Sequence, residues 1–331
     1  MQRESVNWST STVLVTGGTG SFGKRFVEII LREKRPHKLI VFSRDELKQH
    51  EMRQQFPDHP DSPMRYFIGD VRDKDRLTRA FHDVDIVVHA AAMKQVPACE
   101  YNPFEAVQTN IMGAKNIIDV AIDSGVKRVI AVSTDKAVSP VNLYGATKLV
   151  AEKLFVQGNT YAGGRGTRFA CTRYGNVVGS RGSVVPLFQQ QVREGRITIT
   201  DPQMTRFWLT LEQGIQFVIK CIETLEGGEV FVPKIPSMRL VDLADALAGG
   251  CPREIIGIRP GEKIHEVLLS ADEARHAVEY DDMYVILSGG PWIPGSSRNG
   301  GRPLSDGFTY SSDSNSRWLT GDEFRTMLPA V

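Results

Sequence analysis

The glycine-rich segment VLVTGGTGSFGKRF, residues 13–26, constrains the fold of this chain more than any other stretch. Gly17, Gly20 and Gly23 follow an apolar run and precede a helical pattern. Glycines at this spacing permit a tight turn and let the backbone approach a pyrophosphate, which the helix N-terminus then binds through its N–H groups. Because the loop opens a series of alternating strands and helices, it predicts dinucleotide binding. The predicted loop contacts are Thr16, Gly17, Thr19, Gly20, Ser21, Phe22 and Gly23.

The first half of the chain alternates short apolar runs with helical patterns. The predicted strands are TVLVTG, KLIVFSR, MRYFIGD, DIVVHAAA, KRVIAVST and TRFACTRYGNV. They are apolar throughout, as parallel strands buried on both faces are. This repetition predicts an α/β fold built on a doubly wound parallel sheet.

The second half is less regular, and we expect it to form a smaller, interleaved C-terminal substrate-binding domain. The expected domains are residues 1–176 with 205–233 for the dinucleotide, and residues 177–204 with 234–331 for a lid over the carboxyl edge of the sheet. Residues 289–316 are rich in Gly, Ser and Pro and are expected to form a long loop. A last helix is expected at 322–328, with Thr320 as its cap.

Composition excludes several classes of protein. The 331 residues are 41% hydrophobic and carry a net charge of +1, which gives no argument for nucleic acid or an anionic membrane as partner. No apolar run approaches the roughly 20 residues that a transmembrane helix needs, and the N-terminus does not resemble a secretory signal. The four cysteines lack metal-ligand spacing, and so do His89 and His265. We therefore expect a cytoplasmic protein with reduced cysteines and no metal.

The end of the second predicted strand bears on which nicotinamide cofactor is bound. An acidic residue there binds the adenosine ribose of NAD. Here the strand ends in Ser43 and Arg44, and Asp45 falls at a predicted helix start, where it would act as a cap. Ser43, Arg44 and Lys48 suit a 2′-phosphate, so NADP is favoured over NAD. The further predicted contacts are Asp70 and Val71 with the adenine, and Ala90, Ala91 and Lys94 elsewhere on the cofactor; a helix cap is the alternative for Asp70.

A tyrosine and a lysine four residues apart end the segment STDKAVSPVNLYGATK, residues 133–148. At this spacing Tyr144 and Lys148 lie on one face of a helix predicted to begin near Tyr144. An adjacent ammonium stabilises tyrosinate and lowers the pKa of the phenol from about 10 towards working pH. The pair therefore predicts a general base for a sugar hydroxyl, with both residues also contacting the cofactor. A solvated helix face is the alternative for such a pair found alone.

Together, TGGTGSFG, STDK and YGATK resemble the extended short-chain dehydrogenase/reductase superfamily, whose sheet is Rossmann-like. More specifically, the chain resembles the inverting UDP-N-acetylglucosamine 4,6-dehydratases of pseudaminic acid biosynthesis, from Thr12 to about Leu328. The segments that carry the resemblance are FSRDELK, FIGDVRD, HAAAMKQVP, EYNPFEAVQTNIMGA, STDKAVSPVNLYGATK, TRYGNVVGSRGSVVPLF, MTRFWLT, FVPKIPSM and IGIRPGEKIHE. Related retaining dehydratases carry Thr-Asp-Glu where this chain has Thr134, Asp135 and Lys136. The resemblance therefore implies inversion at carbon-5.

The resemblance implies a reaction in which the NADP cofactor ends as it began. Tyr144 would deprotonate the 4-hydroxyl while hydride leaves carbon-4. Lys136, as a neutral amine, would take the carbon-5 proton, which needs a lowered pKa that burial and the neighbouring Lys148 favour. Asp135, if protonated, would give its proton to the departing 6-hydroxyl before hydride returns to carbon-6. Thr134 completes the implied catalytic set. The residue that reprotonates carbon-5 stays open, with Tyr144 as a candidate.

The resemblance also implies how the substrate, UDP-N-acetylglucosamine, is held. Lys94 would reach substrate as well as cofactor, and Asn176 resembles the family residue that hydrogen-bonds the nucleotide-sugar phosphate. In the segment RPGE, Arg259 would clamp phosphate and Glu262 would accept hydrogen bonds from the uridine ribose. Further predicted substrate contacts are Arg181, Val184 and Arg206. A solvated turn or an ordinary surface residue is the alternative at these positions.

Two rival functions stay open. A UDP-sugar 4-epimerase would use the tyrosine and lysine pair but needs no base for carbon-5, so Asp135 and Lys136 argue against it. A non-catalytic NADP-binding sensor would tend to lose that pair, which is intact. A homo-oligomer, either a dimer or a hexamer, is expected. The downstream sugar, its acceptor and the role of the glycine-rich residues 289–307 are not fixed by the sequence.

Overall fold

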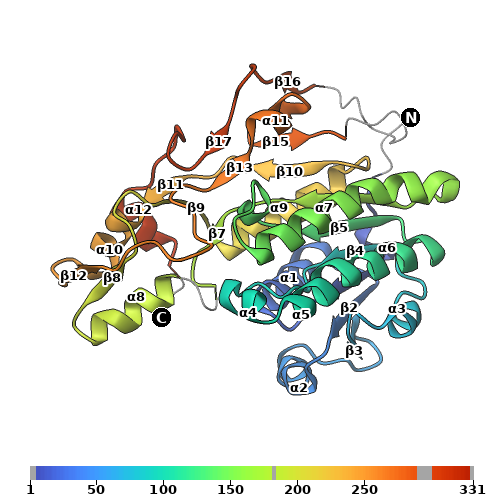
Figure 1. The fold of residues 1–331 in the computed structure, drawn as a ribbon. Coiled ribbons are helices and arrows are strands. Elements are labelled where there is room, and N and C mark those ends of the chain that lie inside the picture. The colour runs from blue at the N-terminus through green and yellow to red at the C-terminus, as the bar shows by residue number, and fades with distance from the viewer. Residues whose placement is uncertain (1–4, 181–183, 289–299, 329–331) are drawn as a thin grey trace.

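The computed structural model describes residues 5–180, 184–288 and 300–328. Within these residues, ten strands form one sheet in the order β16-β14-β15-β10-β6-β5-β4-β1-β2-β3 (Figure 1). The parallel strands of this sheet are β1 (Thr12–Thr16), β2 (Lys38–Ser43), β3 (Met64–Ile68), β4 (Ile86–His89), β5 (Arg128–Val132), β6 (Arg168–Thr172) and β10 (Val230–Pro233). The strand order reverses between β1 and β4, where ligands bind in folds of this kind. The predicted doubly wound sheet is confirmed.

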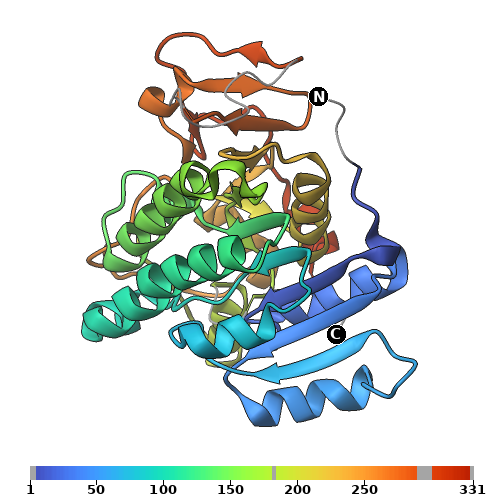
Figure 2. The same cartoon turned by 90° about the vertical axis from the view of Figure 1, so that its right-hand side faces the viewer.

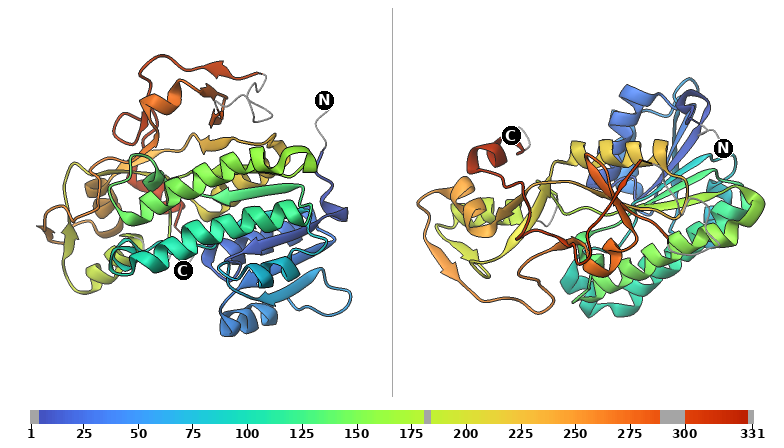
Figure 3. Two further views of the ribbon diagram at one scale, coloured as in Figure 1. Left: turned by 45° about the vertical axis from the view of Figure 1, so that its right-hand side comes forward. Right: turned by 90° about the horizontal axis from the view of Figure 1, so that it is seen from above.

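Helices cover both faces of the sheet (Figure 3). Their bounds in the first half are α1 (Ser21–Ile29), α2 (Glu46–Gln55), α3 (Lys74–Ala80), α4 (Val96–Tyr101), α5 (Pro103–Val107), α6 (Gly113–Asp123) and α7 (Leu143–Ala162), and α9 (Leu211–Thr224) follows later. α1 contacts α9 on one face, and α6 contacts α3 and α7 on the other. Val13 and Val15 share a core cluster with Phe26 of α1, whereas Leu14 shares one with Phe155 of α7. Because both faces are buried, the strands need apolar residues at every position.

Short helical turns connect or extend these elements. They are η1 (Trp8–Thr10), the π-helical turns η2 (Ile30–Lys34) and η3 (Gln108–Met112), η4 (Asp135–Ala137) and η5 (Gly163–Arg165). η4 follows β5 directly and leads to α7, which begins one residue before the predicted start at Tyr144. Asn142 caps α7 by accepting a hydrogen bond from the Gly145 N–H at 2.8 Å. The segment 133–148 thus forms a strand end, a turn and a capped helix start.

Three antiparallel strands extend the sheet beyond β10. They are β15 (Met283–Ile286), β14 (Ala277–Glu279) and β16 (Arg302–Pro303), which Figure 2 shows in orange at the end of the molecule opposite α2. The long loop expected at 289–316 is therefore partly wrong, although residues 289–299 lie outside the described ranges. The expected lid at 234–331 is also too broad, because β15 pairs with the edge of β10 and so returns this segment to the main sheet.

Most other elements of the second half gather at the side towards which β10 points, on the left in Figure 1. Their bounds are β7 (Asn176–Val177), α8 (Val184–Arg193), β8 (Ile197–Ile199), β9 (Thr205–Leu209), β11 (Ser237–Arg239), α10 (Leu240–Ala248), β12 (Arg253–Ile255) and α12 (Gly321–Thr326). Phe188, Trp208, Leu243 and Phe324 share a separate core cluster there. β13 (Val267–Leu269), α11 (Ala271–Ala274) and β17 (Tyr310–Ser311) lie above β10 in that view and pack into the core of the main sheet. The predicted Thr320 cap of the last helix is confirmed.

Membrane-crossing segments were not expected from the sequence. In the described part of the chain, no helix combines the length and the apolar character that crossing a membrane requires.

Candidate active site

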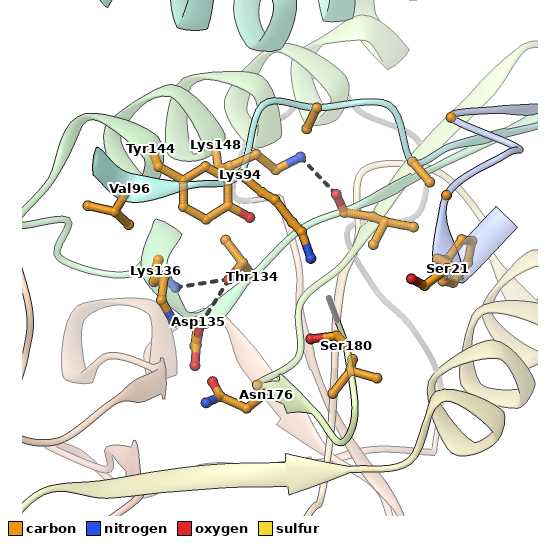
Figure 4. Close-up of a pocket in the computed structure, with 18 of the residues that line it drawn as sticks. Ser21, Lys94, Val96, Thr134, Asp135, Lys136, Tyr144, Lys148, Asn176 and Ser180 are labelled. Carbon is orange, nitrogen blue, oxygen red and sulfur yellow. Dashed lines mark hydrogen bonds and ion pairs between the residues drawn. The ribbon is translucent and has the colours of Figure 1, made fainter. Parts of the chain in front are cut away.

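A cleft of about 1160 Å³ opens at the carboxyl ends of the parallel strands, and both halves of the chain line it (Figure 4). The predicted site residues that line it are Gly17, Thr19, Gly20, Ser21, Phe22, Ser43, Arg44, Lys48, Asp70, Val71, Ala90, Ala91, Lys94, Thr134, Asp135, Lys136, Tyr144, Lys148, Asn176, Val184, Arg206, Arg259 and Glu262. Thr16 and Gly23 are not among the lining residues, and Arg181 lies outside the described ranges. One cleft therefore collects nearly all the predicted cofactor, catalytic and substrate residues.

The glycine loop forms a close-fitting part of this cleft. Gly17 has a φ of +66°, and a Cβ added there would lie 2.9 Å from the backbone nitrogen of Ala91. A Cβ on Gly23 would lie 2.4 Å from Cα of Gly18, so Gly23 permits close approach within the loop instead of lining the cleft. The Thr16 hydroxyl accepts a hydrogen bond from the Ala91 N–H at 3.2 Å. Thr16 and Gly23 thus shape the loop, and the other glycines leave room for a pyrophosphate.

Arg44 and Asp70 lie together at the ends of β2 and β3. Arg44 Nη1 is 3.5 Å from the Asp70 carboxylate, which also accepts hydrogen bonds from Arg72 at 2.8 and 3.0 Å. Burial acts to raise the pKa of Asp70, but the hydrogen bonds from Arg72 outweigh it and hold the pKa below its usual range. The helix-cap alternative for Asp70 is wrong, since Asp73 caps α3.

The neighbouring residues at this end of the cleft have closer partners. Asp45 caps α2, as expected, and its carboxylate lies 2.5 Å from Lys48 Nζ. The Ser43 hydroxyl accepts a hydrogen bond from the Gln49 side chain at 3.0 Å. Arg44 has the longer ion pair and an exposed side chain, so it is the better placed of the two cations to bind an added phosphate.

Tyr144 and Lys148 both line the cleft from α7, but their polar groups point to different neighbours (Figure 4). Lys148 Nζ donates to the carbonyl of Val132 at 2.8 Å. Burial raises the pKa of Tyr144 to about 12, while the charge of Lys136 and a hydrogen bond with Thr134 act to lower it. The predicted lowering by Lys148 is therefore wrong in this structure. The cation that favours the phenolate is Lys136.

Lys136 lies between two buried carboxylates. Its Nζ is 3.1 Å from Asp135 Oδ1 and 3.4 Å from Glu266 Oε1. Asp135 is 1% exposed and Glu266 is 2% exposed. The Thr134 hydroxyl donates to the same oxygen of Asp135 at 2.9 Å, and Arg206 Nε lies 3.8 Å from Glu266 Oε1. Two cations, Lys136 and Arg206, thus lie beside two carboxylates, Asp135 and Glu266.

This arrangement overturns the protonation state expected for Lys136. Burial acts to lower its pKa, but the charges of Asp135 and Glu266 outweigh burial and raise the pKa above its ordinary value. The neighbouring cation that opposes this rise is Arg206. The two carboxylates therefore favour the ammonium form of Lys136. Within the described residues, Asp135 Oδ2 and Glu266 Oε2 are buried without a hydrogen-bond partner, so each can accept one from a ligand.

Sequence reasoning misses Glu266 and Lys263, which also line the cleft. Lys263 Nζ donates to the carbonyl of Val138, and burial lowers its pKa. Both residues lie in the segment IGIRPGEKIHE, which the resemblance includes. A lone glutamate more than 100 positions from Lys136 has no spacing signal that would indicate the contact.

The predicted substrate residues differ in how firmly they are held. Burial lowers the pKa of Lys94, whose amine reaches into the cleft (Figure 4). Arg259 Nη1 lies 3.9 Å from Glu262 Oε1 on a partly exposed turn. Arg206 is buried, and its guanidinium donates to the carbonyls of Thr205, Lys263 and Ile264. Arg206 therefore stabilises the backbone that lines the cleft. Its contact with a pyrophosphate stays a prediction.

The two histidines singled out in the sequence hydrogen-bond to threonines. His89 is buried against the Thr16 hydroxyl at 2.8 Å, and burial lowers its pKa to about 3. His265 pairs with the Thr205 hydroxyl at 2.9 Å. Among the residues that the structure describes, no group of three His, Cys, Asp or Glu side chains is placed to hold a metal ion.

The sheet, the glycine loop and the Tyr144–Lys148 pair define an extended short-chain dehydrogenase/reductase. A family model described as "Polysaccharide biosynthesis protein" matches residues 13–288, and the chain belongs to that family. The chain is 52% identical to a UDP-N-acetylglucosamine 4,6-dehydratase (inverting) of Campylobacter jejuni, over 96% of each chain. It is 42% identical to a UDP-glucose 4-epimerase of Rickettsia canadensis, over 83% of this chain and 82% of the relative.

Solved structures support the same fold. Pen from Bacillus thuringiensis is 39% identical, with a TM-score of 0.88 over 97% of this chain and 98% of that chain. DesIV, a dTDP-glucose 4,6-dehydratase from Streptomyces venezuelae solved with NAD bound, is 23% identical. It gives a TM-score of 0.66 over 76% of this chain and 86% of its own, a likeness that shows the fold alone.

Proposed function

We propose that this chain is a UDP-N-acetylglucosamine 4,6-dehydratase, a hydro-lyase that inverts carbon-5. The observation that carries the proposal is the placement of Asp135 and Lys136 beside Tyr144, in the same cleft as the glycine loop. The 52% identity to an enzyme of that name supports it. The product would be UDP-2-acetamido-2,6-dideoxy-β-L-arabino-hexos-4-ulose, on the way to pseudaminic acid or a related surface sugar. A cytoplasmic location and a homo-oligomer belong to the same proposal.

The cleft fits a nicotinamide dinucleotide, because Gly17, Gly20 and Ser21 line it where the loop enters α1, and the N–H groups at a helix N-terminus bind a pyrophosphate. When bound, the nicotinamide accepts hydride from carbon-4 and returns it to carbon-6. Loop residues Thr19, Ser21 and Phe22 would hold the pyrophosphate. Between NAD and NADP we propose NADP, because the exposed guanidinium of Arg44 can bind its 2′-phosphate.

Tyr144 is placed to take the 4-hydroxyl proton. Its phenol must lose a proton first, and burial opposes this. The ammonium of Lys136 and the hydrogen bond with Thr134 favour the phenolate, so both groups support the base form of Tyr144.

Asp135 and Lys136 share the elimination of the carbon-5 proton and the 6-hydroxyl. One proton passed from Lys136 to Asp135 along their 3.1 Å contact would give a neutral amine and a carboxylic acid. These are the forms in which Lys136 takes the carbon-5 proton and Asp135 protonates the leaving hydroxyl. The pair therefore acts with one proton between its two groups, and no proton from solvent is needed to begin.

Mass spectrometry of the reaction separates the proposal from its main rival. Incubated with UDP-N-acetylglucosamine, the protein should yield a product lighter by one water. A 4-epimerase, the activity named for the Rickettsia canadensis relative, leaves the mass unchanged. An unchanged mass with formation of the galacto isomer would replace the dehydratase proposal by the epimerase.

The cofactor proposal is tested by Arg44→Gln. Removing the guanidinium should weaken binding of NADP by about tenfold or more and leave binding of NAD nearly unchanged, because only NADP carries the 2′-phosphate. Arg72→Gln is the matched control, since Arg72 also bonds Asp70 but does not line the cleft. Equal losses for both cofactors in Arg44→Gln would refute the NADP preference.

A further inference from the structure

Glu266 is a buried acid that the reaction described above does not use. It precedes β13 and so comes from the C-terminal half, whereas Lys136 comes from η4 in the first half. Its Oε1 lies 3.4 Å from Lys136 Nζ, and its Oε2 is buried without a partner in the described residues. Burying an ionised carboxylate costs free energy unless an opposite charge or hydrogen-bond donors lie close to it.

The backbone holds Glu266 in place independently of its side chain. The Glu266 N–H donates to the Ser312 hydroxyl at 2.9 Å, and the Ser312 N–H donates to the Glu266 carbonyl at 2.8 Å. Arg206 lies on the other side of the carboxylate and is itself fixed by three backbone carbonyls. The carboxylate is thus fixed from two directions, and Lys136 is the lysine within ion-pair distance of it in the described residues.

We propose that Glu266 is a positioning residue, which acts on the reaction through Lys136 by fixing the place of its ammonium group and holding the proton on it. This inference rests on the proposed dehydratase function. Asp135 alone would leave the lysine one partner, on the adjacent position of the chain. Glu266 adds a second partner from the other half of the chain, so two carboxylates together fix the orientation of the amine.

The charged and titratable groups that face Lys136 set the expected pH behaviour. They are Asp135 on η4, Tyr144 on α7, Arg206 on β9, and Lys263 and Glu266 in the segment before β13. Asp135 and Glu266 favour the ammonium, while burial and Arg206 oppose it. Because the Asp135–Lys136 pair needs one shared proton, its loss at high pH ends activity. Removing the charge of Glu266 should bring that loss to lower pH.

The test is the pH profile of kcat/KM for UDP-N-acetylglucosamine with the cofactor-loaded protein. In Glu266→Gln the alkaline limb should move down by about one to two pH units, the shift that an opposite charge at this distance produces. Glu266→Asp keeps the negative charge but places it farther from Lys136, because the side chain is one carbon shorter. The alkaline limb of this variant should lie between that of Glu266→Gln and that of the wild type. If Glu266→Gln folds poorly, the smaller shift of Glu266→Asp carries the test alone.

Glu273→Gln is the control for a structural effect. Glu273 is a largely buried carboxylate bound to an arginine, but it does not line the cleft. The Glu273→Gln substitution should lower the melting temperature of the protein and leave the alkaline limb of its kcat/KM profile unchanged. An unmoved alkaline limb in an active Glu266→Gln, or one that moves equally in Glu273→Gln, overturns the inference. A wild-type protein inactive on this substrate would instead refute the proposed function.

Discussion

Lys136 takes its protonation state from its neighbours and not from burial alone. Burial lowers the pKa of Lys94 and Lys148, as expected for amines removed from water. Lys136 has the opposite shift because Asp135 and Glu266 both approach its amine. Lys94, Lys136 and Lys148 all line the cleft, and the two carboxylates beside Lys136 reverse the direction of its pKa shift.

Lys136→Met tests the elimination step at the residue scale. Methionine has a similar length but neither charge nor proton, so we expect turnover of UDP-N-acetylglucosamine to fall by at least about 10²-fold. Oxidation at carbon-4 uses Tyr144 as its base and loses only the support of the Lys136 charge, so absorbance of reduced nicotinamide should still rise, more slowly, when substrate is added and then persist. Turnover within about threefold of the wild type would contradict the assigned role.

The sequence predicts the members of the site better than their protonation states. Thr134, Asp135, Lys136 and Tyr144 are correctly brought to one cleft, because strand ends and helix starts meet at the carboxyl edge of a parallel sheet. The pKa directions expected for Tyr144 and Lys136 are wrong. They depend on distances to side chains such as Glu266, which only the folded chain brings close.

At the scale of elements, the contact between η4 and α7 determines how Lys136 and Tyr144 face each other. A Cβ placed on Gly145 in the first turn of α7 would lie 2.1 Å from the carbonyl oxygen of Lys136. That distance is too short for a carbon and an oxygen, so any side chain at this position must separate the two elements. Glycine is therefore required here by close approach, since its φ is not positive.

Gly145→Ala tests this contact. The methyl group should displace η4 from α7 and lower kcat by about 10²-fold, since a misplacement of about 1 Å is enough for such a loss. Gly164→Ala is the matched control, because a Cβ in η5 would meet nothing within 4 Å. The measurement is kcat of both variants. Similar kcat values for Gly145→Ala and Gly164→Ala would contradict the requirement for close contact between η4 and α7.

Element boundaries were predictable where both a cap and a periodic pattern are present. The last helix is an example, with its capping box of Thr320 and Glu323. β14, β15 and β16 were not predicted, because each has only two to four residues. β14 and β15 form a local hairpin, but the hairpin is joined to the sheet through partners distant in the chain, β10 and β16. Strands this short have too few positions to show a period, and their pairing is decided by the edge of β10.

At the scale of the whole molecule, Arg173 joins the two halves of the chain. It is 1% exposed, and its guanidinium lies 2.6 Å from Glu152 on α7 and 2.9 Å from Glu273 on α11. It also donates to the carbonyl of Leu268 on β13 at 3.0 Å. Burial acts to raise the pKa of Glu273, but Arg173 outweighs it and holds the pKa below its usual range.

Arg173→Met should lower the free energy of unfolding by about 3–5 kcal/mol, because it leaves two buried carboxylates unpaired. Urea unfolding at neutral pH measures this loss. The contribution of Glu273 is present above its unfolded pKa and is lost as pH falls through its lower folded pKa, so the loss caused by the variant should shrink in acid.

Arg196→Met is the control for that experiment, since Arg196 pairs with Glu254 at an exposed site. Its effect should not exceed about 0.5 kcal/mol. Equal losses for Arg173→Met and Arg196→Met would show that the buried cluster does not join the halves.

Proton NMR of UDP-N-acetylglucosamine incubated with the protein in deuterated water tests the central claim most directly. The account predicts a new carbon-6 methyl signal, deuterium at carbon-5 and couplings of the L-arabino configuration. A carbon-6 methyl with the D-xylo configuration retained would keep the dehydratase and contradict the inversion inferred from Lys136. The galacto isomer without a methyl signal would contradict dehydration itself.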